Sequence, residues 1–320
     1  MVGTVTMTTM DSDLTRVKSS AATSQSLSLQ TIIGMVVVAI LWAICFPFIT
    51  VGLPDAPPLL FASLRALLAG GCLVVIGMKM GRRPHYSFRG LMMLALIGFS
   101  YTGMGLGGMF LGARNVGPGV ATVLANAQPL FAAILSLFIL KEVITVRLYL
   151  GLFIGFVGVV ILALPGFDFG ADRSIGALYV LGGAVGTAIG NVLLKRQAGE
   201  GDVYWPMGIQ LILGAVFLFL ASLLVGEGFE VDWTWSFAGV VFVLAIPATA
   251  LMVVLWYALL ARAPLNKLNP FTFLTPVFGL LIGALFFDET FNTVEITGIA
   301  ITVAGLAVIV IVPNWKERVV

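Results

Sequence analysis

Long apolar runs recur along almost the whole chain, and they constrain its fold more than any short motif does. Each run has about 20 residues, the length at which a helix crosses about 30 Å of hydrocarbon. Because lipid offers no hydrogen-bond partners, the backbone of such a run must satisfy its own N–H and C=O groups by forming a helix. We therefore predict an all-α integral membrane protein with ten transmembrane helices. The predicted spans are residues 32–52, 58–78, 90–111, 118–140, 147–164, 174–194, 204–225, 237–260, 268–287 and 293–312.

The composition supports a membrane location and argues against several other classes. The chain is 60% hydrophobic and 10% charged, with a mean hydropathy of +1.09, whereas soluble domains have about 25% charged residues. The formal net charge of +2 gives no basic footprint, so no nucleic-acid partner is expected. A single histidine, His85, and two cysteines, Cys45 and Cys72, exclude a disulfide scaffold and a His-rich metal site. Without a paired-His motif or a Ser-His-Asp set, we expect no enzyme, no metal and no cofactor.

One stretch of the chain recurs at an offset of 147 positions, where residues 116–164 align with residues 263–311. Prolines, glycines and a helix-end acid are harder to match by chance than apolar residues, so their recurrence in order favours a duplicated half. Internal repeats are also typical of transporters. A mid-helix proline removes a backbone hydrogen bond, so Pro129 and Pro276 predict helix kinks, which are candidate gating points. The identities are Pro129 with Pro276, Phe131 with Phe278, Glu142 with Glu289, Gly151 with Gly298, Ile154 with Ile301 and Gly158 with Gly305.

The basic residues predict the orientation of the chain. With the N-terminus inside, 14 of the 17 Lys and Arg residues fall on the cytoplasmic side, while Arg114 and Arg173 lie outside and Arg65 is embedded. This distribution obeys the positive-inside rule. Both termini are therefore predicted to be cytoplasmic, and five spans per half place the second half upside down relative to the first. The predicted division is a disordered cytoplasmic tail over residues 1–30, a first five-helix repeat over 31–166, a second, inverted repeat over 167–313 and a cytoplasmic tail over 314–320.

Several short patterns together resemble a known family. They are Pro57 with Arg65-Ala66 in span two, Pro129 with Lys141-Glu142, Pro276 with Asp288-Glu289, and the glycine pairs Gly151/Gly158 and Gly298/Gly305. In these patterns the chain resembles the drug/metabolite transporter superfamily, in its ten-helix EamA-type branch, over about residues 32–313. The resemblance implies a 5+5 inverted repeat around a central cavity that moves small metabolites such as amino acids, usually outward. The chain departs from the family in span one, where a Lys or Arg often follows the Trp, because Trp42 is followed by Pro47 and no charge.

Arg65 is the sharpest candidate for a functional residue. It lies about 12 Å along the helix from the outer end of span two, and an ionised side chain at depth is costly and usually marks a pathway. The interiors of the predicted spans contain no Asp or Glu to pair with it. Three interpretations compete: a structural staple to backbone carbonyls or a helix-end acid, a site for a substrate anion such as a carboxylate, and a side chain that snorkels outward.

Polar and aromatic residues near the repeated prolines are candidates for lining a substrate site. The alternative is that the polar side chains satisfy backbone groups disturbed by the prolines, and that the aromatic rings serve packing or lipid contact. The polar candidates are Asn126 and Gln128 in span four, Asn269, Thr272 and Thr275 in span nine, Asn191 in span six and Tyr101 in span three; the aromatic candidates are Trp42, Phe46 and Trp256.

Two function classes follow from these observations. The first is a secondary transporter that works by alternating access in the bacterial cytoplasmic membrane, and the family resemblance implies that it is an exporter. The alternative is a channel-like pore or a membrane sensor without transport. Glu142 and Glu289 end their helices as structural acids or as candidate rim proton sites, so a facilitator, an exchanger and rim proton coupling stay open. A small-molecule substrate and the lipid bilayer are the expected partners, and a monomer is compatible with this mechanism although the sequence leaves the oligomeric state open.

Overall fold

The computed structural model describes residues 27–81, 86–116, 121, 124–142, 145–164, 171–198, 202–286 and 292–310. The elements within these residues are helices, and seven of the spans that they form are long and apolar enough to cross a membrane. Two shorter apolar helices cover Gln128–Ile139 and Val146–Ile161. The prediction of an all-helical membrane protein is confirmed, while the count of ten spans, the inverted repeat and the position of the termini stay predictions.

The helices of the first half follow the predicted spans closely at most boundaries. The N-terminal helix begins slightly before its predicted start because the Ser28 hydroxyl accepts a hydrogen bond from the Thr31 N–H and caps it. The remainder of the predicted tail lies mostly outside the described residues. The elements are α2 (Leu29–Ala43), α3 (Cys45–Gly52), α4 (Pro58–Lys79), α5 (Phe88–Ile97), η1 (Gly98–Met104), α6 (Gly105–Asn115), α8 (Gln128–Ile139) and α9 (Val146–Ala163).

The helices of the second half begin with the longest element of the chain, α10 (Ala171–Gln197). A second long helix, α11, ends close to its predicted limit at residue 225. The tail predicted over residues 314–320 lies outside the described residues. The elements after α10 are α11 (Tyr204–Leu224), α12 (Trp235–Ala245), η3 (Ile246–Leu251), α13 (Met252–Arg262), α14 (Leu265–Leu268), η4 (Asn269–Phe273), α15 (Leu274–Phe286) and α16 (Thr293–Val310).

The two repeated prolines start helices instead of kinking them, which corrects the prediction. Pro129 lies in the first turn of α8, directly after a turn at Asn126–Ala127, and Pro276 lies in the first turn of α15. A first-turn residue has no intrahelical partner for its N–H, so proline is tolerated there without cost. The chain is therefore interrupted before each proline, and polar residues of the interruption, such as Asn126 and Thr272, face the interior.

Two spans contain a π-helical segment at corresponding places. η1 lies between α5 and α6, and η3 lies between α12 and α13. In η3, Pro247 lacks the N–H that a regular helix would use, and the Thr249 hydroxyl donates to the Leu244 carbonyl at 2.7 Å. π-Bulges of this kind occur frequently at functional sites.

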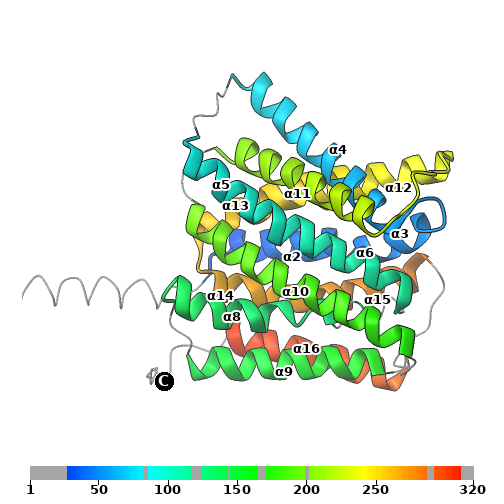
Figure 1. Cartoon of the computed structure of the whole chain (residues 1–320). Coiled ribbons are helices and arrows are strands. Elements are labelled where there is room, and N and C mark those ends of the chain that lie inside the picture. The colour runs from blue at the N-terminus through cyan, green and yellow to red at the C-terminus, as the bar shows by residue number, and fades with distance from the viewer. Residues whose placement is uncertain are drawn as a thin grey trace, which may run out of the picture.

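The helices run side by side, with α4 against α11 at one edge of the bundle and α9 against α16 at the other (Figure 1). The α9–α16 contact depends on the glycines of the repeat. A Cβ atom on Gly158 would lie 2.4 Å from the Thr302 nitrogen, and one on Gly305 would lie 2.3 Å from the Gly155 nitrogen. Small residues therefore let the two backbones approach closely, as they do in other membrane bundles. The space between these edges contains the candidate site.

Candidate functional site

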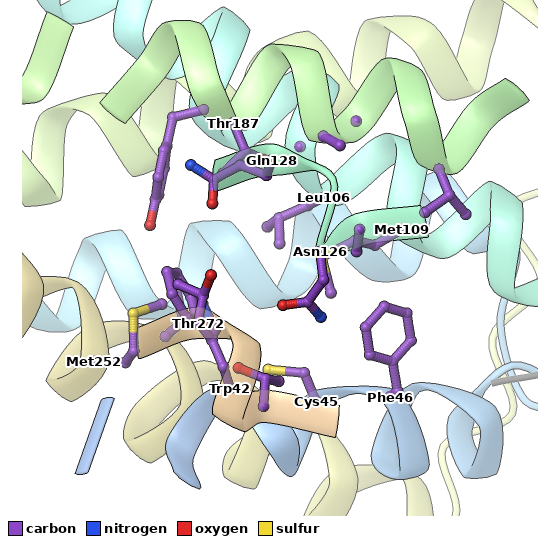
Figure 2. Close-up of a pocket in the computed structure, with 18 of the residues that line it drawn as sticks. Trp42, Cys45, Phe46, Leu106, Met109, Asn126, Gln128, Thr187, Met252 and Thr272 are labelled. Carbon is purple, nitrogen blue, oxygen red and sulfur yellow. The ribbon is translucent and has the colours of Figure 1, made fainter. Parts of the chain in front are cut away.

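A cavity of about 100 Å³ lies in the middle of the bundle, where the π-helical segments and the start of α8 and α15 meet. Figure 2 shows the amides of Asn126 and Gln128 directed toward the space bordered by Trp42, Cys45 and Thr272. Much of the wall is apolar, and Arg65 is the only charged residue among the described residues that line it. The lining residues are Trp42, Cys45, Phe46, Arg65, Tyr101, Gly105, Leu106, Met109, Ala125, Asn126, Gln128, Val180, Gly183, Ala184, Thr187, Leu211, Thr249, Met252, Val253, Thr272 and Thr275.

The Arg65 side chain is held from three sides by neutral groups. It is 1% exposed, which excludes an outward, snorkelling side chain. Its Nε donates to Thr249 Oγ1 at 2.7 Å, and its Nη2 donates to the Ala248 carbonyl at 3.3 Å and to Cys45 Sγ at 3.1 Å. The Phe110 ring lies 5.9 Å from the guanidinium carbon, within the range of a cation–π contact. These contacts fix the guanidinium and match the predicted staple.

The second terminal nitrogen of Arg65 has no partner. Arg65 Nη1, Tyr101 Oη and Thr275 Oγ1 are buried polar atoms without a hydrogen bond, and all three residues line the cavity. Tyr101 lies close enough to Arg65 and Cys45 to interact electrostatically with both. Buried polar groups in proteins nearly always have a partner, so three orphan groups around one cavity indicate a ligand site. The staple and the anion-binding interpretations of Arg65 are thus compatible, because they use different nitrogens.

The structure brings most of the sequence-predicted residues together in this cavity. Three of them, Asn269, Asn191 and Trp256, lie outside its wall. Asn269 is buried behind it and accepts a long hydrogen bond of 3.5 Å from Gln128 Nε2. Asn191 accepts a hydrogen bond of 2.8 Å from Trp256 Nε1, which makes it a structural partner of that indole. The predicted residues that do line the cavity are Trp42, Phe46, Arg65, Tyr101, Asn126, Gln128, Thr272 and Thr275.

Several lining residues were missed by sequence reasoning. Cys45 and Thr187 carry weakly polar side chains in apolar runs, where such residues usually serve packing. Thr249 was missed because its partner, Arg65, is 184 positions away in the chain. One signal was available: Thr249 lies one repeat offset of 147 after Thr102, and two residues after Pro247.

A second polar pair in the bundle corresponds to the Arg65–Thr249 pair. Gln210 aligns with Arg65 at an offset of 145, and Thr102 aligns with Thr249 at 147. Thr102 Oγ1 donates to Gln210 Oε1 at 2.8 Å, between the π-helical segment η1 and α11. Each pair therefore joins the π-segment threonine of one half to a long polar side chain of the other half, and of the two long side chains only Arg65 carries a charge.

The turn between α13 and α14 is held by charged side chains from other spans. Glu142 accepts hydrogen bonds from the Leu265 N–H at 2.9 Å and the Asn266 N–H at 3.0 Å. Lys195 Nζ donates to the Leu260 carbonyl at 2.5 Å and the Ala263 carbonyl at 2.8 Å. Each side chain matches the partial charge of the helix end that it contacts. Glu142 thus has a structural role here, and its predicted counterpart Glu289 lies outside the described residues.

This fold and site define a multi-pass helical membrane protein with a small, largely apolar cavity among its spans that also contains several polar groups. The chain belongs to the EamA-like transporter family, whose model matches residues 29–164 and again residues 174–311. The two matches agree with the sequence evidence for a duplicated chain. The predicted division at residues 166 and 167 stays a prediction.

Individual relatives cover nearly the full length of the chain. The uncharacterized transporter YvbV of Bacillus subtilis is 25% identical over 90% of this chain and 93% of its own. The probable amino-acid metabolite efflux pumps of Salmonella typhimurium and Escherichia coli are 27% and 26% identical, and they match 84% and 88% of this chain and 91% and 95% of their own lengths. A solved crystal structure superposes with a TM-score of 0.72 at 21% identity, over 87% of this chain and 95% of that chain, and shows the same fold.

Proposed function

We propose that the protein is a secondary transporter that exports small carboxylate-bearing metabolites, amino acids among them, across the bacterial cytoplasmic membrane. The observation that carries this proposal is the set of orphan polar atoms, Arg65 Nη1, Tyr101 Oη and Thr275 Oγ1, around one cavity. A substrate that supplies acceptors to these groups removes their desolvation cost. The two relatives named as probable amino-acid metabolite efflux pumps support both the substrate class and the outward direction.

The charge of the cavity favours a substrate with a carboxylate. Arg65 stays protonated in any protein environment, and no Asp or Glu is among the described lining residues. A carboxylate bound at Arg65 Nη1 forms a charge-assisted hydrogen bond in a site of low dielectric, where such bonds are strongest. The guanidinium is held in place by Thr249 and Ala248, so its position is set before the substrate arrives.

The remaining groups of the cavity suit the rest of a small metabolite. The amide oxygens of Asn126 and Gln128 and the hydroxyl of Thr272 are groups that can accept hydrogen bonds from an ammonium or a hydroxyl of the substrate. The rings of Trp42 and Phe46 suit an apolar side chain. An apolar cavity of about 150 Å³ admits benzene, so the volume of about 100 Å³ favours a substrate with few heavy atoms.

The arrangement of the spans supports alternating access in a 5+5 inverted repeat with both termini cytoplasmic. The cavity lies between two closures. On the predicted outer side, Phe46, Val116, Ala121 and Val180 form a buried apolar cluster. On the predicted cytoplasmic side, the Asn191–Trp256 hydrogen bond and the Glu142 and Lys195 contacts hold the spans together. A channel-like pore would need a polar path through both closures.

A monomer contains the whole cavity, so we propose the monomer in the bilayer as the working unit.

Transport by the protein reconstituted in liposomes tests the proposal. The protein is reconstituted and counterflow of a panel of labelled amino acids and monocarboxylates is measured. Arg65→Gln is expected to weaken carboxylate substrates by about ten- to a hundredfold, from the loss of about 1.5–3 kcal/mol for a desolvated charge-assisted bond. An uncharged analogue should be almost unaffected, and Arg65→Lys should rescue only partly because the planar fork is lost.

Arg114→Gln is the matched control, since Arg114 lies in α6 but is exposed and outside the cavity wall. It should leave the apparent affinity unchanged. If Arg65→Gln folds normally and moves amino acids with unchanged affinity, Arg65 is only a staple and the proposed recognition of carboxylates is wrong.

A further inference from the structure

The cavity contains a fixed positive charge that the described residues do not balance. Arg65 is 1% exposed, and the hydrogen bonds of its side chain go to the neutral groups Thr249 Oγ1, Cys45 Sγ and the Ala248 carbonyl. No described Asp or Glu lines the cavity. A guanidinium does not deprotonate in proteins, so it cannot escape the cost of burial by becoming neutral. Between substrate-binding events this charge needs a counterion from solution.

Two orphan donors are available to such a counterion. Arg65 Nη1 and Tyr101 Oη both lack hydrogen-bond partners, both are buried, and both residues line the cavity. They come from different elements, since Arg65 is in α4 and Tyr101 is in η1. The π-helical turn and the contacts of Arg65 with Thr249 hold the two donors in fixed places. The pair is therefore a built anion site and not an incidental surface charge.

The charge and size of the site select a small monovalent anion. One guanidinium balances a single negative charge, whereas a divalent oxyanion would add an unpaired charge in a medium of low dielectric. The rest of the described wall is neutral, with apolar side chains such as Leu106, Met109 and Val253, so it adds no second positive charge for a divalent anion. The volume of about 100 Å³ is ample for a halide.

We propose that a chloride-sized inorganic anion binds between Arg65 Nη1 and Tyr101 Oη when no substrate is bound, and that the substrate carboxylate displaces it. The inference rests on the proposed function, in that it assigns the same cavity to the substrate. Chloride is then a competitive inhibitor of transport. At chloride concentrations well above its own Kd, the apparent KM for the substrate rises in proportion to the chloride concentration. Substrate selectivity also follows, because only a ligand with its own negative charge can replace the anion without leaving Arg65 unbalanced.

Binding is tested on the purified full chain in detergent, without transport. The thermal unfolding midpoint is followed during titration with sodium chloride, and sodium HEPES at equal ionic strength, whose anion is much larger than chloride, is the control for ionic strength. Chloride should raise the midpoint of the wild type saturably. Arg65→Gln should lose this shift, while Arg114→Gln should keep it. Equal shifts in wild type and Arg65→Gln, or the same shift with HEPES, would overturn the proposal.

Tyr101→Phe tests the same anion site in a variant that keeps Arg65, and it serves as the second test if Arg65→Gln does not fold. It removes one neutral donor and should raise the apparent Kd for chloride by about two- to tenfold. An unchanged Kd in this variant would contradict the anion site.

Counterflow in chloride-free liposomes separates this inference from the proposed function. Carboxylate transport with an apparent affinity that chloride does not alter would reject the anion site and leave the transporter assignment standing. Chloride binding through Arg65 without any carboxylate transport would reject the proposed substrate class and leave the anion site standing.

Discussion

Glu142 shows how a single side chain connects two distant spans. Both of its carboxylate oxygens accept backbone N–H groups, from Leu265 and Asn266, at the start of the short helix α14. The carboxylate is directed there by Lys141, which follows the end of α8 and has a left-handed φ of 54°, and by the hydrogen bond from the Glu142 N–H back to the Ser136 carbonyl of α8.

Glu142→Gln should therefore destabilise the protein. The neutral amide keeps one acceptor and places an NH₂ group against a backbone N–H, so we expect a loss of about 1–3 kcal/mol in the free energy of unfolding. Thermal unfolding in detergent measures it. Glu230→Gln is the control, because Glu230 is exposed in the loop after α11, and it should change little. Equal midpoints for the two variants would show that the α14 contact contributes no stability.

The same carboxylate decides between the modes of energy coupling that the sequence leaves open. If a proton binds at the rim, a pH gradient should drive uptake of labelled substrate into inverted liposomes, and Glu142→Gln should abolish the gradient effect while counterflow continues. The double variant with Glu289→Gln covers the second rim acid. Gradient-driven transport that survives the loss of both glutamates would remove the rim-proton hypothesis.

Substitution of Asn191 tests whether this buried amide has a structural role or binds substrate. Its Oδ1 accepts the hydrogen bond of the Trp256 indole, and its side chain does not line the cavity. Asn191→Ala should leave the buried Trp256 N–H unpaired and cost about 1–3 kcal/mol of stability. The apparent substrate affinity in counterflow should stay close to that of the wild type. A large loss of affinity at unchanged stability would instead place Asn191 in the binding site.

The candidate site was predictable from the sequence to the extent that charge or polarity marked its residues. Arg65, Asn126 and Gln128 stand out in apolar runs, and the structure places all three at the cavity. Thr249 and Cys45 do not stand out, because a hydroxyl or a thiol in a helix usually bonds its own backbone. Their role as partners of Arg65 depends on which spans are neighbours, and a pattern within one span contains no such information.

At the scale of elements, hydropathy predicted helix limits well and helix interruptions badly. The span predicted over residues 58–78 corresponds to α4 at Pro58–Lys79, because Pro57 and Pro58 fix its start and the polar residues after Lys79 fix its end. The π-helical segments η1 and η3 and the late start of α8 were not predicted. An apolar run has the same hydropathy in an α-helix and in a π-helix, so only backbone hydrogen bonding distinguishes them.

The α9–α16 contact gives a test at this scale. Gly158→Ala places a methyl group 2.4 Å from the Thr302 nitrogen, which is backbone and cannot rotate away. The helices must separate, and we expect about 1–3 kcal/mol of destabilisation from overpacking. Gly182→Ala is the matched control, since a Cβ on Gly182 of α10 meets nothing within 4 Å, and it should be neutral or slightly stabilising. Thermal unfolding of both variants measures the difference, and a stable Gly158→Ala protein would contradict the close approach of α9 and α16.

At the scale of the whole molecule, the two halves agree in features that no single span determines. The family model matches both halves, each half has a π-helical interruption, and two corresponding hydrogen bonds, Arg65–Thr249 and Thr102–Gln210, join one half to the other. Two pairs of predicted counterpart spans are neighbours in the bundle, since α4 packs on α11 and α9 packs on α16. One difference between the counterparts, a charge on α4 where α11 has the Gln210 amide, lies at the cavity.

The inverted repeat makes a topological prediction that needs no substrate. Phe88 at the start of α5 and Phe229 in the loop between α11 and α12 are 77% and 59% exposed, and the predicted orientation places them on opposite sides of the membrane. In a background with Cys45→Ser and Cys72→Ser, Phe229→Cys should react with an impermeant thiol reagent added to intact cells. Phe88→Cys should react only after the membrane is opened, because the basic segments put it on the cytoplasmic side. The two changes replace the same residue type, so a difference in labelling reports the side and not the side chain. Labelling of Phe88→Cys but not of Phe229→Cys in sealed cells would show that the orientation is the opposite of the predicted one. Equal labelling of both variants, before and after the membrane is opened, would contradict an odd number of spans per half, on which the inverted repeat depends.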